Sequence, residues 1–325
     1  MKLRNLDLTQ NPINEEHRQL GLPPVEEPIS HPGTHPLLRA AVWFTVTVLI
    51  ALVLFLTGRF FLSNNWPDSW QIIGETLDSR IFWSAVAVGF FAQIVDGALG
   101  MAYGVTATTF LLATGASPAA ASASVHIAEI FTTGVSGIAH AKFGNVNKQL
   151  FVRLLVPGIL GGILGAILVT QIDGAMFKPF ISAYLLLLGI YILSKAFRQL
   201  RLRKEAPRHV GKLALFGGFV DAAGGGGWGP VVTSTLVGSG NDPRTTIGSV
   251  NFAEFFLTLT SAAVFALLME TNTWPIIVGL VFGGLFAAPF AAVLCKKLHA
   301  RTLLILVGTL IVIVSLYNLY RALAA

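Results

Sequence analysis

The segment Asp221-Ala-Ala-Gly-Gly-Gly-Gly-Trp-Gly-Pro230 interrupts a long apolar stretch of this chain. Four consecutive glycines disfavour a helix by about 1 kcal/mol each relative to alanine, and they free the backbone. Non-helical backbone at membrane depth is tolerated only where protein groups or water satisfy its hydrogen bonds. We therefore expect this break to line a cavity. It also matches the pattern Gly-x-Gly-x-x-Gly, but no strand precedes it, so it does not indicate a dinucleotide site.

The first half of the chain contains a second copy of this segment. Residues 95–131 align with residues 220–256 without a gap, at an offset of 125, and 14 of the 37 positions are identical. Later glycines four residues apart, Gly161/Gly165 and Gly279/Gly283, match at an offset of 118 and are typical of closely packed helices. The chain therefore consists of two copies of one unit, which is a common way to build transporters.

The composition is that of an integral membrane protein. Of the 325 residues, 54% are hydrophobic and 12% are charged, and the mean hydropathy is +0.71. A soluble domain has about 25% charged residues. Several apolar stretches reach the roughly 20 residues that cross a membrane as a helix. The single cysteine excludes an internal disulfide bond.

The pattern of apolar, polar and basic stretches divides the chain into five parts. These are a flexible cytoplasmic tail (1–36), an extra N-terminal transmembrane helix with an interfacial loop or short helix (37–80), repeat 1 (81–197), a basic cytoplasmic loop (198–212) and repeat 2 (213–325). The tail is polar and rich in proline, and it lacks the pattern of a cleavable signal peptide.

The charges of the loops indicate how the two repeats are oriented. The loop with Lys142 and Lys148 is basic, whereas its counterpart carries Glu270 and neither lysine nor arginine. Equivalent loops therefore lie on opposite sides, because basic loops stay in the cytoplasm. The predicted fold class is all-α: a polytopic membrane bundle of two inverted repeats with broken, re-entrant helices. The net charge of +6 then reflects cytoplasmic loops of an inner-membrane protein with its N-terminus inside, and not nucleic-acid binding.

A helix restarts after each break, and its N-terminus is a candidate anion site. Unpaired backbone N–H groups and the positive end of the helix dipole attract anions there, and glycine lets a ligand approach closely. The candidate substrate-binding residues are Gly100, Gly104, Thr106, Thr108, Gly224, Gly225, Gly226, Gly227, Gly229, Thr233, Ser124, His126, Ser249 and Asn251. With inverted copies the two N-termini would face each other, which suits a small oxyanion.

Four carboxylates, Asp96, Asp221, Glu129 and Glu254, lie within the predicted membrane segments. Such groups are costly there and by default functional, so they are candidates for coupling or gating. For the two aspartates the alternative is that they hydrogen-bond the freed N–H groups of the breaks. No catalytic constellation, cofactor or metal site is predicted. Asn251 replaces His126 in the second copy, which argues against a symmetric metal site.

Both copies share a set of motifs beyond the break itself. These are Asp-x-x-x-Gly-x-x-x-Gly at Asp96 and Asp221, helix starts at Pro118 and Pro243, and Ser-Val-x-x-Ala-Glu at 124–129 and 249–254. In these motifs the chain resembles the sulfite exporter TauE/SafE family of anion permeases, over about residues 81–323. The resemblance implies transport of sulfite or a related sulfur-containing or organic anion across a prokaryotic inner membrane.

The leading hypothesis is a secondary carrier for a small anion that works by alternating access between the copies. The alternatives are an ion-coupled cation transporter, which the four carboxylates favour, and an anion channel. No catalytic constellation supports a membrane enzyme, and the short tail offers no signalling domain. The expected partners are the anion, membrane lipid and a coupling proton or sodium ion, and the sequence leaves the oligomeric state open.

The map with re-entrant hairpins predicts the sidedness of two loops. A cysteine placed at position 205 and another placed at position 298 should both resist an impermeant thiol reagent added outside the cell, because both loops are expected in the cytoplasm. Labelling of either cysteine from outside would contradict the map.

Overall fold

The computed structural model describes residues 35–63, 66–99, 101–197, 209–239, 241, 243–269, 274–297 and 300–324. These residues form helices and the turns between them, with no strand among them. Four of the helices are long and apolar enough to cross a membrane. The predicted all-α polytopic class is therefore confirmed. Residues 1–34 of the predicted tail, residues 198–208 of the basic loop, and Gly100 lie outside the described residues.

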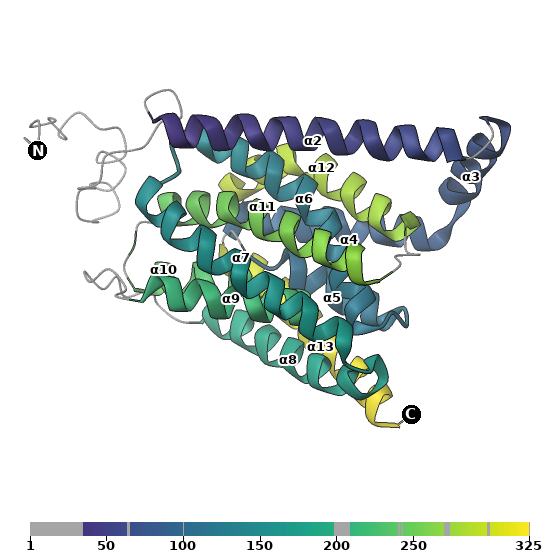
Figure 1. Cartoon of the computed structure of the whole chain (residues 1–325). Helices are drawn as coiled ribbons and strands as arrows, with labels where there is room; N and C mark the ends of the chain where they lie inside the picture. Colours follow the sequence, from purple (N-terminus) through teal and green to yellow (C-terminus); the bar gives the residue numbers. More distant parts are fainter. Residues whose placement is uncertain are drawn as a thin grey trace, which may run out of the picture.

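Two helices precede the duplicated region. α2 (Pro36–Ser63) is apolar and runs along one side of the bundle, next to α6 (Figure 1). Only 6% of its most apolar window is buried, so most of its circumference is free to face lipid. α3 (Trp66–Asp78) follows as a short amphipathic helix.

The two repeats contain the same order of elements, except that η2 and α10 together occupy the place of α5 in the second repeat. The first comprises α4 (Arg80–Leu99), α5 (Tyr103–Ala113), α6 (Pro118–Lys142), α7 (Lys148–Gln171) and α8 (Gly174–Lys195). The second comprises α9 (Val210–Gly224), the π-helical η2 (Trp228–Thr233), α10 (Ser234–Gly238), α11 (Pro243–Leu268), α12 (Trp274–Lys297) and α13 (Ala300–Ala324). At about 1.5 Å per residue, α5 spans roughly 16 Å. It is therefore too short to cross a hydrocarbon core of about 30 Å.

Side-chain caps explain where the long helices of the first repeat begin. The side chains of Ser117, Asn147 and Asp173 accept hydrogen bonds of 2.8–3.2 Å from backbone N–H groups in the first turns of α6, α7 and α8. Such caps satisfy donors that have no partner inside the helix. Pro118 adds a residue that suits the first helical turn.

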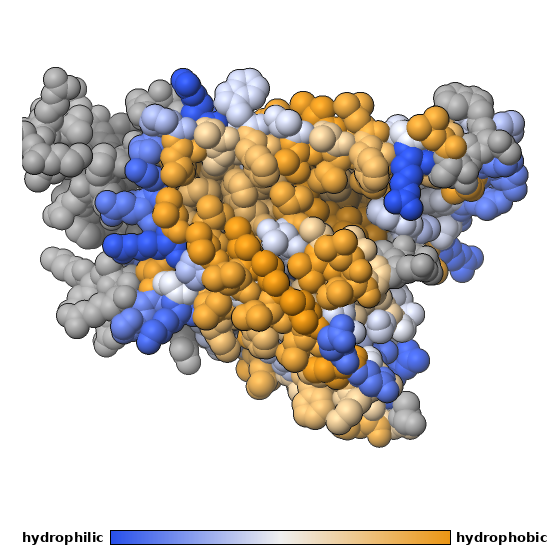
Figure 2. All heavy atoms as spheres, viewed as in Figure 1, coloured by the Kyte–Doolittle hydropathy of each residue, from blue (hydrophilic) through white to orange (hydrophobic). Residues whose placement is uncertain are grey.

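The outer surface of the bundle is apolar across its middle. Figure 2 shows hydrophobic residues filling the centre of the visible face, with hydrophilic residues gathered at the two ends of the helices. Large apolar side chains such as Leu54, Phe91, Leu164 and Leu187 are more than half exposed. A contiguous apolar surface of this extent is typical of contact with lipid.

Helices α7 and α9 pack with their backbones in close contact. A Cβ added at Gly161 would collide with the backbone of Leu215 and Phe219, and one added at Gly165 would collide with Phe219 and Ala223. Small residues four positions apart allow this approach, because membrane helices associate mainly through close packing. The predicted role of Gly161 and Gly165 is confirmed.

The equivalent contact recurs in the other half of the molecule. Gly279 and Gly283 of α12 lie against the backbone of Phe82 and Val86 in α4. Since α12 corresponds to α7 and α4 corresponds to α9, each repeat contributes one helix to each of these pairs. In addition α6 packs against its own counterpart α11, and α8 packs against α13. The two repeats are therefore interleaved along their length.

Replacing Gly161 with alanine tests the contact between α7 and α9. Gly161→Ala should lower the stability by about 1–3 kcal/mol through overpacking, measured as the thermal midpoint in detergent. The control is Gly58→Ala in α2, where an added Cβ meets no atom within 4 Å. This control should keep or raise the midpoint, because alanine is the better helix former. An unchanged midpoint for Gly161→Ala would show that the backbones are not in contact.

Candidate functional site

The chain turns sharply at the second break because two glycines adopt left-handed backbone conformations. α9 ends at Gly224, and Gly225 and Gly226 follow with φ angles of 67° and 155°. Side chains rarely tolerate this region, whereas glycine enters it freely. A helix restarts at Trp228, and Pro230 lies in its first turn.

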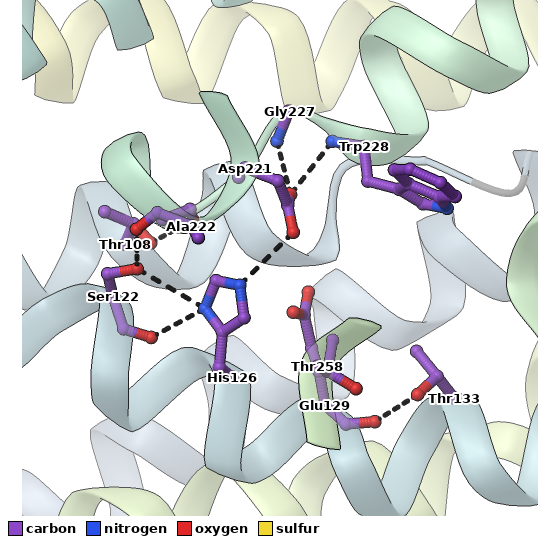
Figure 3. A network of polar contacts seen from close by, with 12 residues as sticks. Thr108, Ser122, His126, Glu129, Thr133, Asp221, Ala222, Gly227, Trp228 and Thr258 are labelled. Atoms are coloured by element: carbon purple, nitrogen blue, oxygen red, sulfur yellow. Dashed lines mark hydrogen bonds and ion pairs between the residues drawn. The ribbon is translucent and has the colours of Figure 1, made fainter. Parts of the chain in front are cut away.

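Asp221 holds this turn together. Its main-chain carbonyl accepts a hydrogen bond from the Gly226 N–H (3.0 Å), and its Oδ1 accepts two more, from the N–H groups of Gly227 (2.7 Å) and Trp228 (2.9 Å). Asp221 thus satisfies backbone donors of the break, which is one of the two roles that the sequence left open for it. Its other oxygen, Oδ2, makes no hydrogen bond and faces His126 (Figure 3).

The first break has matching residue types at the equivalent positions. Asp96 and Tyr103, which begins α5, are the counterparts of Asp221 and Trp228 at the offset of 125, and both are buried. Ala102, just before α5, has a φ angle of 91°. This left-handed conformation costs a non-glycine residue about 1–2 kcal/mol, so packing around the break must hold it.

The two breaks contact each other. A Cβ added at Gly104 would lie 2.9 Å from the Cα of Gly226 and 3.0 Å from Oε1 of Glu129. The Thr108 hydroxyl donates a hydrogen bond across this contact to the Gly225 carbonyl. In this structure the second break is therefore lined by backbone and side chains of the first repeat, and not by the open space that a cavity would offer.

A buried polar network lies beside this contact (Figure 3). The Ser122 hydroxyl of α6 donates a hydrogen bond to the Ala222 carbonyl of α9 (2.6 Å). His126 Nδ1 lies 2.8 Å from the main-chain oxygen of Ser122, and its Nε2 lies 3.2 Å from Asp221 Oδ2. Potential ligand atoms of His126, Glu129 and Asp221 all lie within 4.8 Å of one another. The network joins the two repeats.

The four predicted intramembrane carboxyl groups come together in this region. All four are buried. Glu129 interacts electrostatically with Asp96 and Asp221, and Glu254 interacts with all three. Desolvation of one unpaired ion costs several kcal/mol even after the protein relaxes. The group therefore requires protons or cations when it is shielded from water.

The remaining predicted donors fall into two groups. Thr106, Thr233 and Asn251 are buried, and each has a side-chain oxygen without a hydrogen-bond partner. These oxygens are free to meet a ligand. By contrast, the Ser249 hydroxyl accepts a hydrogen bond from the backbone at the start of α7 (2.8 Å), and the Ser124 hydroxyl donates to a carbonyl one turn earlier in its own helix (2.7 Å). Both serines therefore have structural partners.

Sequence reasoning missed Tyr184, which lies within an apolar run of α8 that carries no motif. Its hydroxyl donates a hydrogen bond to the Gly226 carbonyl (2.9 Å). A Cβ at either Gly224 or Gly227 would collide with this side chain. Glycine at these two positions therefore makes room for the Tyr184 side chain. This packing accounts for both glycines without a substrate that approaches the backbone there.

Residues 85–318 match the family model described as Sulfite exporter TauE/SafE. The chain belongs to this family. The TauE/SafE match begins within α4 and ends within α13, so α2 and α3 precede it. The chain is also 44% identical over 238 residues to "Probable membrane transporter protein YtnM" of Bacillus subtilis (strain 168), an alignment that covers 70% of this chain and 79% of the relative. No solved structure matches. The resemblance inferred from the duplicated motifs is confirmed, and the protein is placed among membrane transporters.

Thr108 and Thr233 occupy equivalent positions in this TauE/SafE protein but have different partners. Thr108→Val should lower the stability by about 1–3 kcal/mol, because it leaves the buried Gly225 carbonyl without its donor. Thr233→Val should leave the stability unchanged or raise it, because that hydroxyl has no partner to lose. Thermal unfolding in detergent measures both, and equal losses for the two variants would contradict the assignment.

Proposed function

We propose that this protein is a secondary transporter for sulfite or a related small sulfur-containing or organic anion, which binds where the two helix breaks meet. The observation that carries the proposal is the contact of Gly104 with Gly226 inside a buried polar centre, with one break supplied by each repeat. Membership of the TauE/SafE family supports the transporter class and the choice of anion. The similarity to YtnM, described as a probable membrane transporter, also supports transport.

Alternating access would follow from the duplication. If the copies are inverted, as the charges of their loops indicate, an exchange of conformation between them opens first one side of the membrane and then the other. The pairing of α4 with α12 and of α7 with α9 supports this relation. The contact between the breaks would part and re-form in each cycle. The N-terminus and the basic loops would lie on the cytoplasmic side of the inner membrane.

Anion binding requires donors that are not already engaged. The N–H groups of Gly227 and Trp228 are held by Asp221, so the start of η2 is not an open anion site in this conformation. The hydroxyls of Thr106 and Thr233 are buried without partners. Leaving a buried donor unsatisfied costs about 1–3 kcal/mol, and a bound oxyanion would recover that cost. We therefore assign these two hydroxyls to the substrate.

The buried carboxyl groups would couple transport to a second ion. An ionised carboxylate repels an approaching anion, so Asp96, Glu129, Asp221 and Glu254 must be neutralised by protons or cations when the anion enters. The same groups favour a second candidate function, which is ion-coupled transport of a cation. An open channel is disfavoured by the direct contact between the breaks.

Exchange of labelled sulfite in proteoliposomes tests the anion function. The purified protein should show saturable exchange, and the double variant Thr106→Val with Thr233→Val should raise the KM about a hundredfold or more. This estimate follows because each of the two hydrogen bonds to a charged group contributes about 1.5–3 kcal/mol. Thr109→Val is the control, since that hydroxyl bonds the Val105 carbonyl within α5 (2.6 Å), and it should keep the wild-type KM.

The same assay distinguishes the two candidate functions. If the wild-type protein fails to exchange sulfite and related anions but takes up sodium or another cation saturably, the anion function is wrong and the second candidate replaces it.

A further inference from the structure

His126 and Glu129 of α6 and Asp221 of α9 form a compact cluster, here named the α6–α9 triad (Figure 3). All three side chains are buried, and their potential ligand atoms lie within 4.8 Å of one another. Two of them belong to the first repeat and one belongs to the second. A cluster of carboxylates does not by itself identify a ligand. The contacts of the His126 imidazole give a second, independent indication.

The contacts of His126 determine where its ring carries a proton. Nδ1 lies 2.8 Å from the main-chain oxygen of Ser122, which can only accept a hydrogen bond, and 3.3 Å from the Ser122 hydroxyl. Because that hydroxyl donates its proton to the Ala222 carbonyl, we infer that Nδ1 carries the proton and donates to the main-chain oxygen. In the neutral ring the lone pair of Nε2 then points towards Asp221. A histidine that binds a metal ion almost always donates its other N–H to a backbone carbonyl or a carboxylate in this manner.

Nε2 of His126 faces Asp221 Oδ2 without a hydrogen bond. The histidine side chain is fully buried, and neither atom has a hydrogen-bond partner. A lone pair and a carboxylate oxygen repel each other, so a cation or a proton must lie between them. The two atoms are 3.2 Å apart. Ligand atoms that share one ion at about 2.0–2.2 Å lie roughly 3.0–3.5 Å from each other, so the spacing fits a shared metal ion.

Both carboxylates can reach the same ion. Glu129 lies three residues after His126 and therefore projects from the same face of α6. Its carboxylate lies within 4.8 Å of the other two ligand atoms, so a small shift of this side chain would complete the site. Asp221 is held through Oδ1 by the N–H groups of Gly227 and Trp228, which leaves Oδ2 for an ion. Outer contacts of this kind orient the ligands of metal sites.

We propose that the α6–α9 triad binds one divalent transition-metal ion of the Zn²⁺, Mn²⁺ or Co²⁺ type. One imidazole with two carboxylates suits these ions, whereas Mg²⁺ and Ca²⁺ prefer oxygen ligands alone. The ion neutralises the two carboxylates of the triad and reduces their repulsion with Asp96 and Glu254. The sequence predicted no metal site because Asn251 replaces His126 in the second copy. The triad is instead a single, asymmetric site with ligands from both repeats.

Three protein ligands leave a coordination position for water or for an external ligand. In the transport cycle that position would take an oxygen of the anion, next to the contact between Gly104 and Gly226. This role rests on the proposed anion transport, whereas the metal site itself rests on the triad alone.

Titration with Co²⁺ tests the site directly, because bound Co²⁺ absorbs visible light more strongly than the hydrated ion. Chelator-treated wild-type protein in detergent should bind one Co²⁺ per chain, and Zn²⁺ should displace it. His126→Asn, which installs the residue of the second repeat, should weaken Co²⁺ binding at least about tenfold. Glu129→Gln should do the same while keeping the side-chain volume. His140→Asn removes a histidine of α6 that contacts Asn145 (3.4 Å) and should bind Co²⁺ as the wild type does.

Two results would overturn the metal site. The first is that the wild-type protein fails to bind Co²⁺, in which case a shared proton lies between His126 and Asp221. The second is that His126→Asn binds Co²⁺ as tightly as His140→Asn does. Size-exclusion profiles and thermal midpoints verify that each variant is folded. Sulfite exchange on the same preparations separates the two proposals. If the wild-type protein binds Co²⁺ but does not exchange sulfite, the metal site is supported and the anion function is wrong. If His126→Asn loses Co²⁺ binding but exchanges sulfite as the wild type does, the metal ion has no role in transport.

Discussion

The structure depends on satisfying the backbone groups that each helix break exposes inside an apolar surrounding. A membrane offers no water to these groups, and each unsatisfied one costs several kcal/mol. Asp221 resolves this for the second break with one main-chain and two side-chain hydrogen bonds. This aspartate therefore has a structural role at the break that does not depend on any role in transport.

The cap at the second break brings a carboxylate into an apolar surrounding that disfavours charge. Asp221 gives one carboxylate oxygen to the break and turns the other towards His126, while Glu129 and Glu254 add two further buried carboxyl groups. These buried carboxyl groups require protons or cations to balance their charge. The same aspartate that stabilises the second break therefore also adds to the buried acidic charge at its centre.

Glycine serves two different purposes in this fold. At Gly225 and Gly226 it permits left-handed backbone in the turn between α9 and η2. At Gly161 and Gly165 the backbone is helical, and glycine allows two helices to approach more closely than any side chain would permit. The first use positions the functional centre, and the second holds the two repeats together around it. The sequence distinguishes them by spacing, since consecutive glycines break a helix and glycines four residues apart mark a packing face.

The sequence by itself determined the membrane class, the duplication, the positions of both breaks and the four intramembrane carboxylates, because hydropathy, spacing and glycine content are local properties of the chain. Only the tertiary structure decided which groups are engaged and which are free. Ser249 supports the start of α7, Tyr184 fills the space beside Gly224, and Thr108 has a partner that its counterpart Thr233 lacks. It also brought His126 to Asp221 across about a hundred residues of chain. Contacts between distant helices depend on how the two repeats interleave, and no periodicity or motif within a single segment encodes that arrangement.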